Sequence, residues 1–147
     1  MGGRNDGIYI YPSSPHPLIL HIPYHTGLSY TTFQYSDLQV IGTVSASSSA
    51  IVSAVITNTG PVFGAEVVQL YLSFPPVANE PPQLLRGFEK VFVTSLDSAF
   101  VSFTIAAQEV SVFDETLDDW KIVPGVYGVR VGSSSRDIRL LGTLTVH

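Results

Sequence analysis

The sequence predicts an all-β fold in which antiparallel strands form a sandwich of two packed sheets. Short runs of alternating or β-branched apolar residues recur along the chain, and turn-forming residues separate them about every ten positions. No long stretch has the roughly 3.6-residue spacing of apolar residues that is typical of an amphipathic helix. The 147 residues are enough for one domain with a buried core.

The predicted sandwich is organised around residues 57–74. This segment begins with a turn in which Asn58 and Gly60 tolerate positive φ and Pro61 fixes its own φ, so we expect the chain to reverse there. In the strand that follows, one face is apolar and the other is mixed. The apolar face is expected to carry Val68, Leu70, Leu72 and Phe74. Such a strand suits the interior of a sandwich, with neighbours on either side.

The remaining strands are expected at residues 28–40, 50–57, 84–93, 100–105, 125–131 and 138–146. Small residues at 42–49 predict a loop, and the four prolines of 75–82 predict a stiff, polyproline-like connector. A single helical turn is expected around residues 106–109. Residues 132–135 are expected to form a loop in which serine hydroxyls satisfy backbone amides.

The first 27 residues are rich in proline, glycine and serine. Their closely spaced prolines exclude a helix or a central strand, so we expect an extended arm at 1–27 that packs along the edge of a sandwich formed by 28–147. No secretory leader or membrane-spanning run is recognisable in the sequence. Two alternatives follow: a cytosolic protein, or a piece of a longer secreted one.

The composition excludes several classes of function. Charged residues make up 13% of the chain and apolar residues 45%, which argues against intrinsic disorder. The net charge of −5 and the scattered seven lysines and arginines argue against nucleic-acid or anionic-membrane partners. The absence of cysteine excludes thiol catalysis and Cys-ligated metal. The low charge predicts that some apolar surface is covered by a partner.

Acidic residues next to the single tryptophan are the first candidates for chemistry; they are Asp114, Glu115, Asp118 and Asp119, beside Trp120. Glycoside hydrolysis needs two carboxylates about 5–5.5 Å or 6.5–9.5 Å apart. The same cluster could bind a sugar, or hold a hard cation through oxygen ligands. We favour a structural role instead, with Trp120 covering the core.

A histidine set on the N-terminal arm is the second candidate. His16, His21 and His25 could ligate zinc, but the prolines between them impose no common face, so solvated or singly bonded histidines are favoured. The serines at 133–135 have no neighbouring histidine or nucleophile-elbow context and are interpreted as loop residues. We therefore expect neither enzyme activity nor a bound cofactor or metal.

Four segments, in order, carry a resemblance to a known family. They are GLSYTTF at 27–33, TNTG at 57–60 with GAEVVQLY at 64–71, PPQLLRGFEKV at 81–91, and VGSSSRDI at 131–138. Over about residues 24–146 the chain resembles the fibronectin type III-like domain at the C-terminus of family 3 glycoside hydrolases, especially fungal β-glucosidases. The resemblance implies a fibronectin type III or immunoglobulin-like antiparallel β-sandwich and an extracellular location.

Five residues in or beside these segments are interpreted as structural. Gly60, Gly64 and Gly132 belong to turns, and Gly87 lets the backbone bulge or approach a neighbour. Arg86 is expected to pair with a carboxylate or to cap carbonyl groups at a sheet edge.

The resemblance also implies what the chain lacks. In the family, the nucleophilic aspartate and the acid/base carboxylate lie in two upstream domains, which this chain does not contain. Tyr24 and His25 stand where the family has a tighter turn, and this changes the expected interface with those domains. We therefore assign the candidate binding surface to Trp120, Asp118, Asp119, Tyr24 and His25.

The favoured hypothesis is a non-catalytic accessory module with a structural or binding role. Its predicted partner is another copy of the chain, bound through the surfaces that cover the catalytic domains in the family. One alternative is an independent secreted protein that binds a cell-wall glycan or a protein receptor. Another is a fragment of a β-glucosidase whose catalytic domains are absent here.

Overall fold

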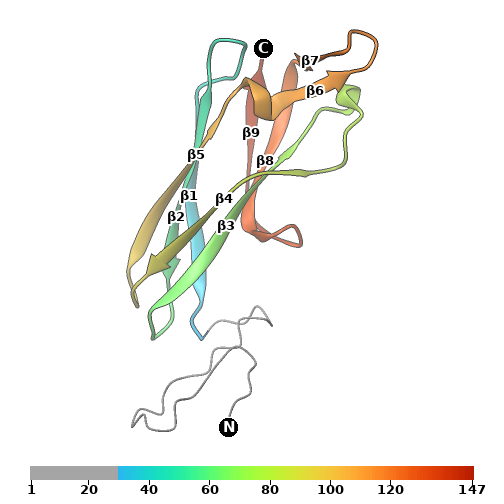
Figure 1. The fold of residues 1–147 in the computed structure, drawn as a ribbon. Helices are drawn as coiled ribbons and strands as arrows, with labels where there is room; N and C mark the ends of the chain where they lie inside the picture. The colour runs from blue at the N-terminus through green and yellow to red at the C-terminus, as the bar shows by residue number, and fades with distance from the viewer. Residues whose placement is uncertain (1–29) are drawn as a thin grey trace, which may run out of the picture.

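Two antiparallel sheets and one short hairpin form the fold that the structure, a computed structural model, describes for residues 30–147 (Figure 1). The expected arm at 1–27 lies outside these residues. The three-stranded sheet has the order β1 (Phe33–Ile41), β2 (Ala50–Asn58), β5 (Ser98–Ile105). The four-stranded sheet has the order β4 (Leu84–Val93), β3 (Gly64–Ser73), β8 (Gly125–Ser134), β9 (Asp137–Val146). The hairpin pairs β6 (Ser111–Asp114) with β7 (Asp119–Ile122).

The chain passes between the two sheets after β2, after β4 and, by way of the β6–β7 hairpin, after β5, as is usual in sandwiches of this kind. Two short 3₁₀ helices, η2 (Pro76–Ala78) and η3 (Ala107–Val110), lie in the connections. All pairings are antiparallel within the named strands, which confirms the predicted fold class. Among residues 30–147, no helix combines the length and the apolar character that crossing a membrane requires.

The core lies between the sheets and is built from alternate residues of their strands. Its fully buried members include Val52, Ile56, Val68, Leu70, Leu72, Val101, Ile105, Val129 and Leu144. The predicted inward face of β3 is therefore confirmed. At one end, the buried ring of Tyr127 meets Phe74 edge to face, and its hydroxyl donates to the carbonyl oxygens of Val123 and Val110 at 2.7 and 3.2 Å.

The connection from β2 to β3 is held by the fully buried side chain of Asn58. Its amide nitrogen donates to the carbonyl oxygens of Val62 and Val93, at 2.8 and 2.9 Å. Its amide oxygen accepts from the Thr31 hydroxyl and the Gly60 amide, at 2.5 and 2.9 Å. Because a side-chain amide has two donors and two acceptor lone pairs, the hydrogen-bonding capacity of Asn58 is filled.

This connection corrects one expectation. Asn58 and Gly60 do not have positive φ. Among residues 30–147, other residues adopt a positive φ, such as Asn79 and Leu96. Glycine is required at position 60 for space, because a Cβ there would lie 2.9 Å from the Thr31 Cα. Thr31 also blocks a side chain at Gly64, where a Cβ would lie 2.5 Å from its methyl group.

Three other expectations about elements were wrong in detail, and one element was not predicted. The first strand begins at Phe33, and β8 continues through 132–134, which were expected to form a loop. The 75–82 connector contains η2, which ends at Asn79 in the left-handed conformation, so it is not a continuous polyproline segment. The β6–β7 hairpin follows the predicted helical turn but was not predicted itself. Its strands have four residues each, too few for a clear alternation.

Replacement of Asn58 by alanine is expected to lower the free energy of unfolding by about 3 kcal/mol, because several buried backbone groups lose their partner. Thr59→Ala is the matched control, since the exposed Thr59 hydroxyl bonds only at the surface to Thr32. Urea denaturation of both variants measures the difference. Equal stability of the two variants would contradict the role assigned to the buried amide.

Candidate functional site

The acidic residues around Trp120 lie on the β6–β7 hairpin and its turn. Asp114 begins the turn: its carboxylate accepts from the Thr116 amide and hydroxyl at 2.9 and 2.6 Å. Lys121 forms an ion pair with the same carboxylate at 2.6 Å. The hydrogen bonds from Lys121 and then Thr116 hold the pKa of Asp114 well below its usual range. A carboxylate held in this way serves the turn and is poorly suited to act as a general acid at neutral pH.

The other carboxylates of the hairpin do not complete a catalytic or metal site. Asp118 adopts a positive φ of 55° in the turn, and the Asp119 carboxylate accepts from the Trp120 amide at 2.8 Å. Within residues 30–147, no group of three or more histidines and carboxylates is placed to hold a metal ion. Tyr24, His25 and the other histidines of the proposed zinc set lie outside the described residues.

Trp120 does not cover the core, contrary to expectation: 64% of its surface is exposed. The hairpin stands outside both sheets, and Val110, Val123 and Tyr127 close the core beneath it. The indole instead meets the Phe113 ring edge to face, with centroids 5.6 Å apart. It also borders a surface hollow of about 470 Å³. Trp120 is therefore available to a partner or ligand.

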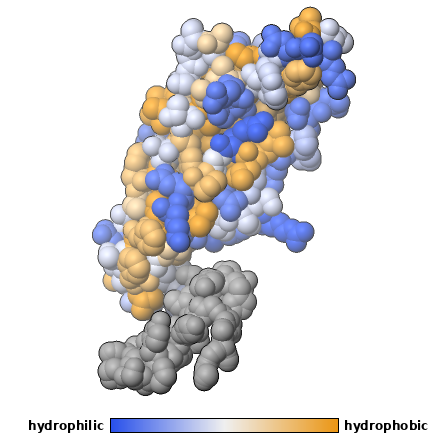
Figure 2. All heavy atoms as spheres, in the orientation of Figure 1, coloured by the Kyte–Doolittle hydropathy of each residue, from blue (hydrophilic) through white to orange (hydrophobic). Residues whose placement is uncertain are grey.

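A second feature is an apolar surface on the outer face of the four-stranded sheet. In β3 the buried residues alternate with outward ones, and the register places Phe88 and Phe92 of β4 beside the outward residues Gln69 and Ala65. The whole set, called the β3–β4 apolar face, consists of Phe63, Val67, Leu85, Phe88 and Phe92, all exposed. Figure 2 shows orange side chains over the part of the molecule where β3 and β4 lie.

Ring contacts order part of the β3–β4 apolar face. Phe63 stacks on Phe92 with centroids 6.1 Å apart and the rings nearly parallel. The Lys90 ammonium lies 5.3 Å from the Phe92 centroid. With 69% of its surface exposed, Phe88 is the most exposed aromatic residue of the set. Such a cluster of exposed large apolar side chains is typical of a contact surface.

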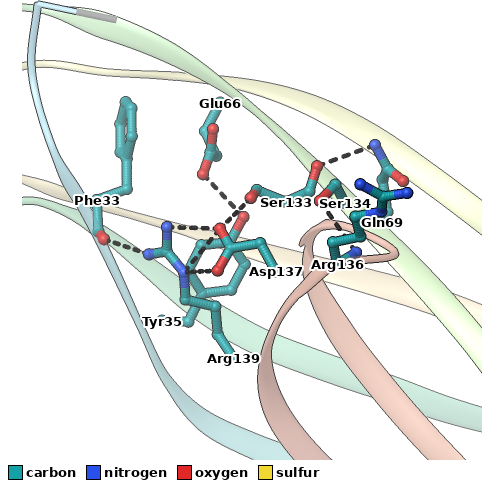
Figure 3. A network of polar contacts seen from close by, with 9 residues as sticks. All are labelled: Phe33, Tyr35, Glu66, Gln69, Ser133, Ser134, Arg136, Asp137 and Arg139. Atoms are coloured by element: carbon teal, nitrogen blue, oxygen red, sulfur yellow. Dashed lines mark hydrogen bonds and ion pairs between the residues drawn. The ribbon is translucent and has the colours of Figure 1, made fainter. Parts of the chain in front are cut away.

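The third feature is a polar seam where β1, β3, β8 and β9 meet (Figure 3). It is formed by Tyr35, Glu66, Ser133, Asp137 and Arg139. The Tyr35 hydroxyl donates to the Glu66 carboxylate at 2.9 Å. Arg139 forms an ion pair with Asp137 at 2.9 Å, and its guanidinium carbon lies 5.0 Å from the centroid of the Tyr35 ring. The Ser133 hydroxyl donates to Asp137.

Burial shifts the pKa values of Glu66 and Tyr35 in this seam, whereas hydrogen bonds shift that of Asp137. Burial raises the pKa of Glu66, although the hydrogen bond from Tyr35 and the charge of Arg139 oppose the shift. Burial and the nearby Glu66 carboxylate raise the pKa of the Tyr35 hydroxyl well above its usual range. Hydrogen bonds from Arg139 and Ser133 lower the pKa of Asp137. Both carboxylates are thus engaged by protein groups, and the seam fastens the two sheets together.

The residues interpreted as structural lie in the sheets or at their connections, and Gly132, expected in a turn, lies within β8. The Arg86 guanidinium donates to the Glu109 carbonyl at 2.9 Å, so the carbonyl-capping alternative is the correct one. Gly87 lies beside a bulge in the β3–β4 pairing, and a Cβ there would lie 3.0 Å from the Phe103 ring. At Gly132 a Cβ would lie 2.0 Å from the Asp137 carbonyl oxygen, so close strand packing requires glycine there.

The sequence interpretation missed both the β3–β4 apolar face and the polar seam. A signal for the first was present, because Phe88 and Phe92 alternate along a strand with Lys90 between them. Glu66 was a weaker signal for the second, as a single carboxylate at the start of an apolar strand. Its partners Tyr35 and Arg139 are distant in sequence, so only the fold brings them together.

Comparison with known proteins agrees with this topology. Residues 66–135 match the family described as fibronectin type III-like domain. This part of the described sandwich is therefore assigned to a fibronectin type III-like domain.

Longer relatives define the type of domain. A probable β-glucosidase N of Emericella nidulans is 43% identical over 136 residues, which cover 79% of this chain and 20% of that protein. The crystal structure of a β-D-glucoside glucohydrolase from Trichoderma reesei superposes with a TM-score of 0.77 at 38% identity, covering 82% of this chain and 19% of the other. The crystal structure of a family 3 (GH3) β-glucosidase from Bifidobacterium adolescentis superposes with a TM-score of 0.75 at 37% identity. The match covers 81% of this chain and 18% of the other.

The chain thus spans about a fifth of the length of the relatives it matches. It belongs with the C-terminal fibronectin type III-like domains of glycoside hydrolase family 3 β-glucosidases. The match covers about a fifth of these proteins and falls on their fibronectin type III-like part rather than on their catalytic domain.

Replacing Glu66 by glutamine is expected to change how stability depends on pH. Because the folded state raises the pKa of Glu66 above the ordinary 4.5, the contribution of this carboxyl is fully present below that pH and is lost as pH rises through the raised pKa. The stability of E66Q relative to the wild type should therefore increase with pH over this window, since glutamine stays neutral and still accepts from Tyr35.

Urea denaturation at a series of pH values from about 4 to 8 measures this difference. Glu89→Gln, which removes an exposed carboxylate of β4, is the matched control for the loss of one charge. A stability difference between E66Q and wild type that falls with rising pH would contradict the assignment.

Proposed function

We propose that this chain is a non-catalytic accessory module of a family 3 β-glucosidase and that its β3–β4 apolar face packs against another part of that protein. The observation that carries the proposal is the apolar face itself, on a domain whose relatives are about five times longer. An extracellular location, as the family resemblance implies, belongs to the same proposal.

The chemistry of the β3–β4 apolar face supports packing against protein. Burying a phenylalanine side chain contributes about 1.5–3 kcal/mol, so the exposed rings of Phe63, Phe88 and Phe92 could together stabilise a domain contact. Lys90 lies between Phe88 and Phe92 along β4 and provides one charge that a complementary acidic group can recognise. Apolar rings with a few charges are typical of stable interfaces between protein surfaces.

A chimaera tests this proposal directly. The matched region of the Emericella nidulans relative is replaced by this chain, and thermal stability and glucoside hydrolysis are measured. The double substitution F88S/F92S should lower the melting temperature of the chimaera by several degrees, because the contact loses two buried rings. Phe100→Ser is the matched control, since Phe100 is 67% exposed on β5 of the other sheet.

Denaturation of the isolated chain carrying F88S/F92S separates a loss of contact from a loss of folding. The proposal requires that the substitutions destabilise the chimaera more than the isolated chain. A chimaera in which F88S/F92S and F100S have the same effect would refute packing through this face.

The same face predicts self-association of the isolated chain, because its side chains are exposed among residues 30–147 and a second copy can cover them. Sedimentation velocity of the purified chain at about 1 mg/ml and about 10 mg/ml should show concentration-dependent dimers or larger species. The F88S/F92S variant should sediment as a monomer, whereas F100S should behave as the wild type. A wild-type chain that remains monomeric at the higher concentration would count against this prediction.

A further inference from the structure

Two hollows lie side by side at one end of the sandwich. One, of about 300 Å³, is lined by the serine-rich loop at 45–49 and by Ala106, Ala107 and Gln108. The other, of about 470 Å³, is lined by Ala107, Gln108, Ser111 and Trp120. Because both share Ala107 and Gln108, they adjoin across the start of η3. Figure 1 shows the β1–β2 loop and the β6–β7 hairpin at this same end of the molecule.

The lining of these hollows has an unusual composition for a protein surface. It consists of serine hydroxyls, one side-chain amide, small alanine surfaces and one indole ring, and it contains no charged side chain. Charged ligands gain most from opposite charges in a site, which this lining does not offer. A neutral ligand with many hydroxyl groups and a flat apolar face matches it better.

The indole of Trp120 is held in position rather than mobile on a loop tip. Trp120 lies within β7, opposite Phe113 in the hairpin register, and the Phe113 ring contacts it edge to face. The ion pair between Lys121 and Asp114 closes the hairpin next to it. An exposed indole held by a second ring is a suitable platform for stacking against the apolar face of a sugar ring.

Hydrogen-bonding groups line the hollow beside this platform and the hollow that adjoins it. The Ser111 hydroxyl donates to the Ala107 carbonyl at 2.7 Å, which leaves its oxygen lone pairs as acceptors. Gln108 lines both hollows, and its amide nitrogen donates to the Glu109 carboxylate at 3.3 Å, which leaves the amide oxygen as an acceptor. The serine loop is braced internally, with the Ser45 and Ser48 hydroxyls 2.8 Å apart and Ser48 donating to the Thr43 carbonyl at 3.0 Å. A bound ligand therefore meets a largely ordered surface.

We propose that the two hollows form one groove that binds a neutral oligosaccharide, with one sugar ring stacked on Trp120 and the next reaching past Gln108 toward the serine loop. Two adjoining hollows favour an oligosaccharide over a single sugar. This site is separate from the β3–β4 apolar face, so it does not depend on the packing proposed above. Only the choice of β-glucosyl probes for its test rests on the names of the relatives.

Trp120 is the only tryptophan of the chain, so its fluorescence reports directly on the site. Cellotetraose and laminaritetraose are titrated as β-linked probes, maltotetraose as an α-linked one, and glucose as a single ring. A saturable change in the emission of Trp120 is expected with at least one tetrasaccharide, and binding at least tenfold weaker with glucose. No change with any tetrasaccharide at about 10 mM would overturn the proposal.

Calorimetry with the best tetrasaccharide extends the test to variants. Trp120→Ala and Gln108→Ala should each weaken binding by tenfold or more, while Trp120→Phe, which keeps a ring, should lose less than Trp120→Ala. Leu117→Ala is the matched control, because Leu117 is exposed in the turn of the same hairpin. F88S/F92S should bind as the wild type. Binding that W120A and Q108A leave unchanged would place the ligand elsewhere and refute the groove.

Discussion

The buried amide of Asn58 is the interaction on which the arrangement of the two sheets depends. It lies at the end of β2, where the chain leaves one sheet for the other, and it also reaches the end of β4 through the Val93 carbonyl. Backbone bonds reinforce this junction, because the Asn58 amide donates to the Asp97 carbonyl and the Leu96 amide donates to the Asn58 carbonyl, both at 2.9 Å. One side chain therefore satisfies backbone groups at two of the three crossings between the sheets, those after β2 and after β4. A residue without matched donors and acceptors would leave these groups buried and unpaired.

The polar seam complements this junction at the open edge between β1 and β9. Asn58 is fully buried and uncharged, whereas the seam is partly solvated and combines carboxylates, a guanidinium and a phenol. The two sets of contacts depend differently on pH. The hydrogen bonds of the neutral Asn58 amide are insensitive to pH, whereas the stability that the seam contributes changes with the protonation of Glu66 and Asp137. The sandwich is thus fastened at two places by different chemistry.

Most of the sheet structure could be predicted because alternation along a strand is a local property. The inward faces of β3 and β8 follow directly from the order of residues such as Val68, Leu70 and Val129. The position of Trp120 could not be predicted in this way, because a tryptophan beside acidic residues is compatible with either burial or exposure. Its exposure results from the β6–β7 hairpin, whose strands are too short to give a recognisable pattern. The polar seam depends on contacts between strands that are far apart in sequence.

The hairpin is a two-stranded sheet of its own, inserted in the connection between β5 and β8. Its tip residues do not contribute to the core, which Val110 and Tyr127 complete without them. Changes of sequence in the turn between β6 and β7 therefore carry little risk for the folding of the sandwich. Related domains can diversify at this position while their cores stay the same. In protein engineering, the hairpin is accordingly the place to graft loops of other lengths and compositions onto this scaffold.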